Sequence, residues 1–227
     1  MRISAVLVAA GTGSRMGAGF NKVYMPLAGE CVLWHTVKAV AESGVFSELV
    51  IVTGREDFEK AEQIASCFDI VYKITEGGAT RQESVLNGIS VCTGELVAVH
   101  DGARALVTPE LLRSVADAAI KYGAAALGVM PKDTIKAADA DGFIERTIPR
   151  ESAYQIQTTQ VFKKDALIAA HKRAIEDGFA VTDDCMVMER EGVKIKIVEG
   201  SYENIKLTTP EDIYTAERIL KERGQTK

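Results

Sequence analysis

The chain has 227 residues, of which 47% are hydrophobic and 26% are charged, and its formal net charge is −5. This length gives one good-sized domain, and the composition excludes a disordered or fibrous chain. The negative charge argues against a protein that binds a nucleic-acid backbone through a basic face. No run approaches the roughly 20 apolar residues that span a bilayer, and the N-terminal apolar run is too short for a signal peptide. We therefore expect a cytoplasmic protein.

The cysteine spacing gives no sign of a zinc site or a disulfide framework. The four cysteines are far apart and form no Cys-x-x-Cys pair: Cys31, Cys67, Cys92 and Cys185. Spacing of this kind is typical of buried free thiols in a reducing compartment.

The first functional signal is an apolar run over residues 3–10 that ends in a glycine-rich segment over residues 11–17. This pattern predicts a buried strand feeding a loop whose backbone can approach phosphate. Neither the dinucleotide fingerprint nor the Gly-Lys-Ser/Thr phosphate loop fits the spacing. Instead, Arg15 lies inside the segment and Lys22 just beyond it, which suits a triphosphate. The alternative is an ordinary turn with solvated basic residues.

Strand-like and helix-like segments then alternate along the chain. This alternation predicts a Rossmann-like α/β fold, with a mostly parallel sheet flanked by helices and ligand sites at the carboxyl ends of the strands. The expected strands are 3–10, 49–53, 70–74, 96–99, 124–130 and 194–198, the expected helices include 31–41, 57–68 and 163–176, and 157–162 is expected to return to the body of the domain.

A double glycine precedes a helix start in the middle of the chain. Residues 80–83 read Thr-Arg-Gln-Glu, which predicts a capping box, so a helix begins there. Its first turn carries Arg81 and Ser84, beside Gly78. Such a helix start could read the edge of a base, or it could be plain capping with nothing bound.

The strand over 96–99 ends in His100 and Asp101. A carboxylate at the end of a central strand is suited to bind Mg²⁺ next to a nucleotide triphosphate, so Asp101 is the metal candidate. His100 is interpreted as a hydrogen-bonded structural residue rather than a base. Further along, Thr108 and Thr209 are each followed by proline, which predicts two more helix starts.

The alternating segments 132–137 and 144–148 flank an Asp-Gly pair at 141–142, which predicts a β-hairpin. A lone hairpin is marginal in water, so we expect it to pack against another subunit. The chain is thus interpreted as one domain, 1–227, with a β-arm insertion at 132–157. Lys206 is expected at a strand end beside the site.

Taken together, these segments resemble one family over nearly the whole chain: the 2-C-methyl-D-erythritol 4-phosphate cytidylyltransferases of the non-mevalonate isoprenoid pathway. The glycine loop alone indicates only a sugar nucleotidyltransferase, and the later motifs are more specific. The motifs are Ala9-Ala10-Gly11-x-Gly13-x-Arg15-Met16 with Lys22, Arg81-x-x-Ser84-Val85, His100-Asp101-x-Ala103-Arg104, Asp133-Thr134-x-Lys136, Thr182-Asp183-Asp184 and Asn204-Ile205-Lys206-x-Thr208.

The resemblance implies that a sugar-alcohol phosphate attacks the α-phosphorus of CTP and releases pyrophosphate. It implies catalytic roles for Arg15, Lys22 and Lys206, whose cations would surround the triphosphate, with Mg²⁺ as cofactor on Asp101. The CTP-binding residues that it implies are Ala9, Ala10, Gly11, Gly13, Gly78, Ser84 and Asp101.

For the acceptor, the resemblance implies Thr134 and Arg150 from a partner's arm, and Arg104, Thr158 and Thr182 from the same subunit. An arginine suits the acceptor phosphate because its fork binds two oxygens. This arrangement requires a homodimer formed through the β-arm.

The chain departs from the family pattern at Gly102, Ala105 and Thr159, and we expect a looser backbone near the metal and acceptor sites there. Two alternatives stay open at this point. One is a ribitol-5-phosphate cytidylyltransferase, which uses the same CTP machinery, and the other is a non-catalytic nucleotide-binding module.

Overall fold

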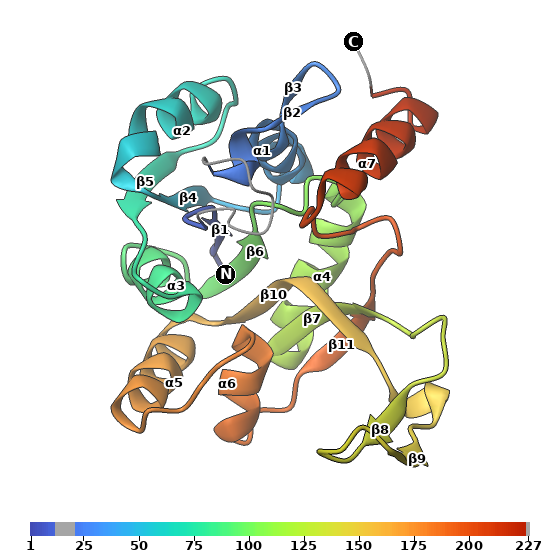
Figure 1. The fold of residues 1–227 in the computed structure, drawn as a ribbon. Helices are drawn as coiled ribbons and strands as arrows, with labels where there is room; N and C mark the ends of the chain where they lie inside the picture. Colours follow the sequence, from blue (N-terminus) through green and yellow to red (C-terminus); the bar gives the residue numbers. More distant parts are fainter. Residues whose placement is uncertain (12–20, 226–227) are drawn as a thin grey trace.

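A seven-stranded sheet forms the centre of the molecule in the computed structural model, which describes residues 1–11 and 21–225 (Figure 1). The strand order is β11-β7-β10-β6-β1-β4-β5. The strands are β1 (Ile3–Val8), β4 (Glu48–Thr53), β5 (Tyr72–Glu76), β6 (Leu96–Asp101), β7 (Ala124–Val129), β10 (Gln155–Lys163) and β11 (Lys196–Glu199). All neighbours pair in parallel except β10, which is antiparallel to β6 and to β7. The predicted mostly parallel, Rossmann-like sheet is therefore confirmed.

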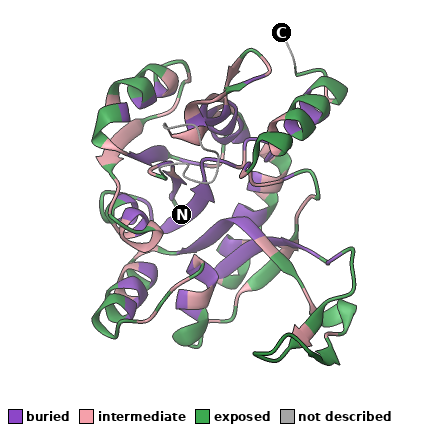
Figure 2. Ribbon diagram, viewed as in Figure 1, coloured by how far each residue is buried: buried purple, intermediate pink, exposed green. Residues whose placement is uncertain are grey.

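Helices cover both faces of this sheet. The side chains of β1, which point alternately to the two faces, show which helices cover each face. Leu7 packs into the cluster that α1, α2 and α4 join, whereas Val6 packs into the cluster of α3, α5 and α6, because successive side chains of a strand point to opposite faces. Figure 2 shows the inner strands of the sheet as a buried layer between the helices, whereas the edge strands β5 and β11 are partly exposed. The helices are α1 (Val32–Ser43), α2 (Phe58–Ala65), α3 (Arg81–Ser90), α4 (Pro109–Tyr122), α5 (Lys164–Glu176), α6 (Asp184–Arg190) and α7 (Pro210–Glu222).

The helix starts follow the predicted signals. Thr80 and Glu83 form the capping box of α3, with both the side-chain and the backbone hydrogen bonds present. Thr108 caps α4 ahead of Pro109, and Thr209 caps α7 ahead of Pro210. The helix ends were predicted less accurately. Helix α2 ends at Ala65, three residues before the predicted end, and the prediction missed this because no sequence signal marks the boundary.

The hairpin predicted from the Asp-Gly pair consists of β8 (Lys136–Ala138) and β9 (Ile144–Thr147). Gly142 has φ of 87°, which a glycine adopts at little cost. The hairpin projects from the sheet as an arm (Figure 1), and its residues are coloured mostly as exposed in Figure 2. Phe143 and Ile144 at its tip are 72% and 67% exposed.

Three short elements that were not predicted lie between β1 and α1 in the described part of the chain. They are the 3-10 helix η2 (Lys22–Tyr24) and a small hairpin of β2 (Pro26–Leu27) and β3 (Glu30–Cys31). Helix α7 packs its apolar side against this hairpin region, through a third cluster that includes Leu27 and Leu220. Lys22 is thereby the first residue of a short helix rather than part of an open loop.

The prediction of four buried cysteines was wrong in part. Cys92 and Cys185 are buried, but Cys31 is partly exposed and Cys67 is exposed. Cys67 follows the early end of α2, where its thiol turns back to the carbonyl oxygen of Gln63, 3.2 Å away. All four cysteines are free, as expected. Among the described residues, no helix is long and apolar enough to cross a membrane.

Candidate active site

A cavity of about 510 Å³ opens at the carboxyl ends of β1 and β6 and reaches the first turn of α3. This edge of a parallel sheet is where nucleotide sites form. Eight predicted site residues line it: Ala9, Ala10, Gly11, Lys22, Gly78, Ser84, Asp101 and Lys206. Two other predicted site residues, Gly13 and Arg15, lie outside the described residues.

The floor of the cavity is fixed by backbone hydrogen bonds to neighbouring strands. The Ala9 amide donates to Val52 O at 2.7 Å, and the Gly102 amide donates to Val8 O at 2.9 Å. The Gly102 carbonyl also accepts from Thr36 Oγ1, so both polar groups of this glycine are engaged. The ends of β4, β1 and β6 are therefore tied together where a ligand would rest.

The glycine turn before α3 lies close to the end of β1. A Cβ atom on Gly77 would lie only 2.3 Å from Cβ of Ala10, so no other residue fits this approach without movement. The Gly78 amide donates to Ser84 Oγ at 3.0 Å, and that hydroxyl donates to the Thr80 carbonyl at 2.9 Å. Ser84 thus orders the turn from inside the helix.

Lys22 is positioned by its neighbours in η2. The Asn21 side-chain amide donates to the Ala9 carbonyl, and its oxygen accepts from the Val23 amide at 3.3 Å. On the other side, Tyr24 OH lies 3.0 Å from Thr53 Oγ1 at the end of β4. These contacts attach the segment that carries Lys22 to the ends of two central strands.

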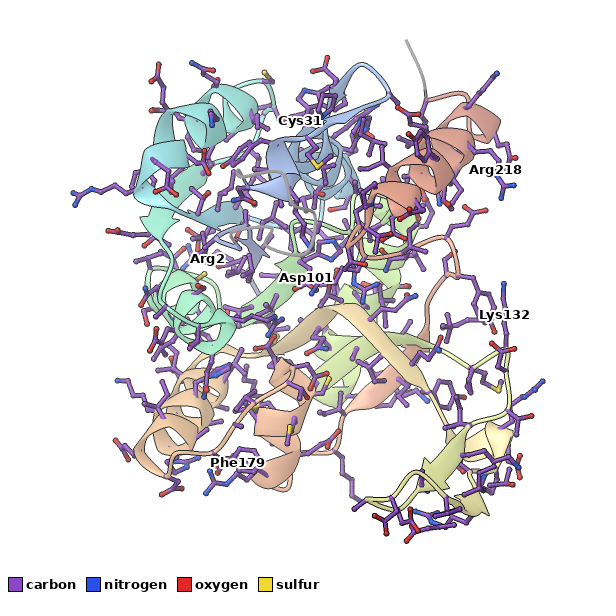
Figure 3. All side chains as sticks on the ribbon, in the orientation of Figure 1. Arg2, Cys31, Asp101, Lys132, Phe179 and Arg218 are labelled. Atoms are coloured by element: carbon purple, nitrogen blue, oxygen red, sulfur yellow. The ribbon has the colours of Figure 1, made fainter. Side chains whose placement is uncertain are left out.

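Asp101 collects cations from three parts of the chain. Its Oδ2 lies 2.8 Å from Lys206 Nζ and 3.9 Å from Arg104 Nε, and its Oδ1 lies 3.4 Å from Arg81 Nε. Burial alone would raise the pKa of the Asp101 carboxyl, but Arg81 and Lys206 outweigh burial and hold it well below its usual range. The carboxylate is therefore ionised at neutral pH. Figure 3 labels Asp101 in the middle of the molecule.

His100 has the contacts of the structural residue that the sequence predicted. Its Nδ1 lies 2.9 Å from Thr159 Oγ1, and its Nε2 lies 3.2 Å from the Arg104 carbonyl. The side chain is buried, and burial lowers the pKa of the imidazole to about 4. A neutral ring held at both nitrogens supports the backbone beside Asp101 rather than proton transfer.

The predicted acceptor residues fall into two groups. Thr158 and Arg104 lie near the cavity: Thr158 Oγ1 accepts from the Asp101 amide at 3.0 Å, and Arg104 Nη1 donates to the Asn204 carbonyl at 2.7 Å. Thr182 is exposed just before α6, where its hydroxyl contacts Met186 Sδ.

Thr134 and Arg150 lie at the arm, away from this cavity, and both are exposed. Arg150 Nη2 donates to the carbonyl of Lys132, which Figure 3 labels near the base of the arm. A site on the same subunit therefore does not include these two residues, and their role for a partner stays a prediction.

Sequence reasoning misplaced one residue and missed others. Lys206 lies in the irregular segment between β11 and α7, not at a strand end, because β11 stops at Glu199. Arg81 lines the cavity but was given no role, although its place in the first turn of a capped helix was a usable signal. Asn21 had no such signal, because its contact with Ala9 depends on the tertiary fold.

Comparison with known proteins decides the family. The family model described as "IspD: 2-C-methyl-D-erythritol 4-phosphate cytidylyltransferase" matches residues 3–222. The chain belongs to this family. A relative of that name from Caldanaerobacter subterraneus is 48% identical over 226 residues, covering 97% of this chain and 100% of the relative. Another from Clostridium acetobutylicum is 40% identical over 229 residues, covering 97% and 98%.

Solved structures agree with this membership. The 4-diphosphocytidyl-2C-methyl-D-erythritol synthase of Anaerococcus prevotii matches with a TM-score of 0.89 and 32% identity, covering 97% of this chain and 96% of that one. The Thermus thermophilus cytidylyltransferase matches with a TM-score of 0.81 and 29% identity, covering 97% and 100%. As a family member, the chain is a nucleotidyltransferase that joins CTP and 2-C-methyl-D-erythritol 4-phosphate in isoprenoid biosynthesis.

Proposed function

We propose that the cavity at the ends of β1 and β6 is the site of this cytidylyl transfer, and that Lys22, Lys206 and Arg15 are the catalytic residues. The observation that carries the proposal is that both lysines line one cavity together with the ionised carboxylate of Asp101. Lys22 comes from η2 and Lys206 from the segment before α7, so their charges converge from distant parts of the chain. Convergent cations of this kind stabilise a transferring phosphoryl group.

In the proposed step, an oxygen of the acceptor phosphate attacks the α-phosphorus of CTP. The new phosphorus–oxygen bond forms as the bond to the β-phosphate oxygen breaks, and pyrophosphate leaves with the electron pair. The attacking phosphate is already ionised, so no general base is needed. The lysines would stabilise the negative charge that accumulates as two anions are pressed together.

The base would be bound by backbone near Ala9, Ala10 and Gly11, facing the turn of Gly78 and Ser84. Carbonyl groups fixed in this way can accept from the amino group of cytosine, and they would lack a donor opposite uracil. We therefore expect CTP to be preferred over UTP. Gly13 is expected to continue this binding segment.

Asp101 is proposed to hold Mg²⁺. Magnesium is usually bound through one or two carboxylates plus substrate phosphates rather than by an all-protein cage. Within residues 1–11 and 21–225, no group of three or more His, Cys, Asp or Glu could form such a cage, and Asp101 is an ionised carboxylate facing the cavity. The residues present thus fit the ion in its usual mode. When bound, the ion would neutralise charge on the phosphates.

The acceptor is proposed to bind between Arg104, Thr158 and Thr182 of one subunit and Thr134 and Arg150 on the arm of a partner. The arm supports this because its apolar tip residues, Phe143 and Ile144, are mostly exposed in the single chain and would be covered in a homodimer. We also propose a cytoplasmic location, where a reducing environment keeps the four free thiols reduced.

The deciding experiment measures pyrophosphate release by the purified protein with CTP and Mg²⁺. Methylerythritol phosphate and ribitol 5-phosphate are compared as acceptors, and UTP replaces CTP in a third reaction. We expect rapid release only in the reaction that contains both methylerythritol phosphate and CTP. Release only with ribitol 5-phosphate would move the enzyme to another pathway, and no release with either acceptor would contradict a catalytic role.

A further inference from the structure

A line of polar side chains runs from the protein interior to the cavity, and part of it does not touch the cavity at all. His171 Nε2 on α5 lies 3.1 Å from Asp184 Oδ1, at the start of α6. Asp184 Oδ2 lies 2.9 Å from Arg81 Nη2, and Arg81 Nε lies 3.4 Å from Asp101 Oδ1. Of these four residues, only Arg81 and Asp101 line the cavity.

The inner pair is fully buried. The side chains of His171 and Asp184 are both 0% exposed, whereas that of Arg81 is 28% exposed. Burial alone would raise the pKa of the Asp184 carboxyl, but Arg81 and the hydrogen bond from His171 outweigh burial and lower it. A buried carboxylate that stays ionised requires partners on both oxygens, and it has them here.

The direction of the inner hydrogen bond is fixed by the surroundings of the imidazole. His171 Nδ1 is buried and has no hydrogen-bond partner among the described residues. If the proton were on Nδ1, that nitrogen would be a buried donor without an acceptor. If the proton is on Nε2, Nδ1 has only an unused acceptor lone pair, which costs less free energy. Nε2 therefore carries a proton and donates it to Asp184 Oδ1, which leaves Oδ2 for Arg81.

Arg81 consequently contacts two carboxylates, each through a different nitrogen of its guanidinium. Nη2 binds Asp184, and Nε binds Asp101. An arginine that faces a single carboxylate prefers to bind both of its oxygens. If Asp184 lost its charge, Arg81 could turn fully toward Asp101 and cover an oxygen that a cation or Lys206 requires.

We propose that His171 and Asp184 are positioning residues that act through Arg81: they hold its guanidinium away from Oδ2 of Asp101, and so set the Mg²⁺ dependence of CTP binding. This inference rests on the proposed role of Asp101 as the magnesium ligand. Neither residue touches the cavity, so each acts only through the next contact in the line. Partners of metal ligands commonly have such an effect, and their loss changes metal affinity by about 10- to 100-fold.

The test is calorimetric titration of CTP into each purified variant at a series of Mg²⁺ concentrations, without acceptor and therefore without turnover. For Asp184→Asn and His171→Leu, the Mg²⁺ concentration that gives half of the maximal CTP affinity is expected to rise about tenfold. His171→Gln keeps a donor near the Nε2 position and is expected to stay close to the wild-type value. Asp183→Asn is the matched control, since Asp183 caps α6 without contacting Arg81.

Melting temperatures are recorded for every variant, because a merely structural role would lower stability and leave the Mg²⁺ dependence unchanged. Folded Asp184→Asn and His171→Leu proteins that titrate like the wild type would overturn the proposal. If Asp184→Asn does not fold, Arg81→Lys replaces it: a lysine keeps the charge but cannot bridge two carboxylates, so the same shift is expected. Wild-type Mg²⁺ dependence in Asp101→Asn would instead refute the proposed function of Asp101.

Discussion

The ammonium of Lys206 lies 2.8 Å from Oδ2 of Asp101, so a proposed catalytic cation and the proposed magnesium ligand are paired with each other. The pair joins β6 to the segment before α7, which are far apart in the sequence. Lys206 is 36% exposed on its side chain and Asp101 only 10%, so the lysine is the member that can turn toward a ligand. A triphosphate in the cavity would offer it a second anionic partner.

We expect Lys206→Met to lower kcat by about 10²-fold or more, because a charge that stabilises the transition state is lost. The affinity for CTP in the presence of Mg²⁺ should stay the same or increase, since Asp101 loses a competing cation. Steady-state kinetics and calorimetry separate the two effects, with Lys194→Met as a control on an exposed lysine. Weaker CTP binding with an unchanged kcat would assign Lys206 to substrate binding alone.

Lys22→Ala is expected to reduce turnover by about 10²-fold or more while the protein stays folded. The reason is that Lys22 faces the cavity from a short helix that Asn21 and Tyr24 attach to the ends of β1 and β4. Pyrophosphate release and the melting temperature are measured together. Lys38→Ala, on α1, serves as the control, and full turnover in a folded Lys22→Ala protein would refute the role.

Gly77→Ala should weaken CTP binding by about tenfold or more. The added Cβ would lie 2.3 Å from Cβ of Ala10, so the glycine turn and the end of β1 must move apart, and both are proposed to contact the base. Overpacking of this kind costs about 1–3 kcal/mol. The readout is the dissociation constant for CTP, with Ser90→Ala at the far end of α3 as the control. Unchanged affinity would place the base elsewhere.

A complementation experiment tests the arm. Arg150→Ala and Lys22→Ala should each be nearly inactive alone, the first through its arm and the second through its own site. After mixing and subunit exchange, a heterodimer contains one site with an intact Lys22 that receives an intact Arg150 from the partner. Activity should therefore reappear in the mixture. A mixture as inactive as its components, in a protein that light scattering shows to be dimeric, would contradict a shared site.

Glu48 should make the stability of the fold dependent on acid pH. Burial alone would raise the pKa of its carboxyl, but hydrogen bonds from Ser4, Thr93 and Lys73 lower it from 4.5 to about 2. A lowered carboxyl pKa adds stability above the unfolded value, and this stability is lost as pH falls toward 2.

We expect Glu48→Gln to unfold more easily than the wild type at pH 7, by about 2 kcal/mol in the free energy of unfolding. The difference should shrink between about pH 4.5 and 2. Urea denaturation at several pH values measures it. A difference that does not change with pH would mean that packing, not charge, makes Glu48 stabilising.

The sheet and most helix starts could be predicted because their causes are local. Apolar runs of four to eight residues predicted the central strands, and Thr80, Thr108 and Thr209 marked helix starts by the hydrogen bonds that a threonine cap makes. The antiparallel direction of β10 was not predictable in this way. Strand direction is set by where the chain re-enters the sheet after the arm, and no residue in β10 itself specifies that.

The site was predicted only where a motif or a strand end carried the information. Asp101 follows a buried strand, and Lys22 follows a glycine loop, so both were accessible from sequence. The contact of Asn21 with Ala9 and the contact of Arg81 with Asp184 were not, because the latter joins residues 103 positions apart. Such pairs depend on the tertiary fold, which brings the first residues of α3 and α6 together and which the sequence pattern does not encode locally.

The backbone hydrogen bonds beneath the cavity also have a consequence for motion. The amides of Ala9 and Gly102 donate to carbonyls of adjacent central strands, and the strands around them are fully buried. Amides of this kind exchange their hydrogen with solvent only when large parts of the protein unfold. These two amides should therefore exchange slowly even without nucleotide, and more slowly still with it, because a bound ligand raises the free energy of that unfolding. The backbone beneath the cavity would therefore already be rigid before CTP binds. The conformational entropy lost on binding would come from the surrounding segments instead.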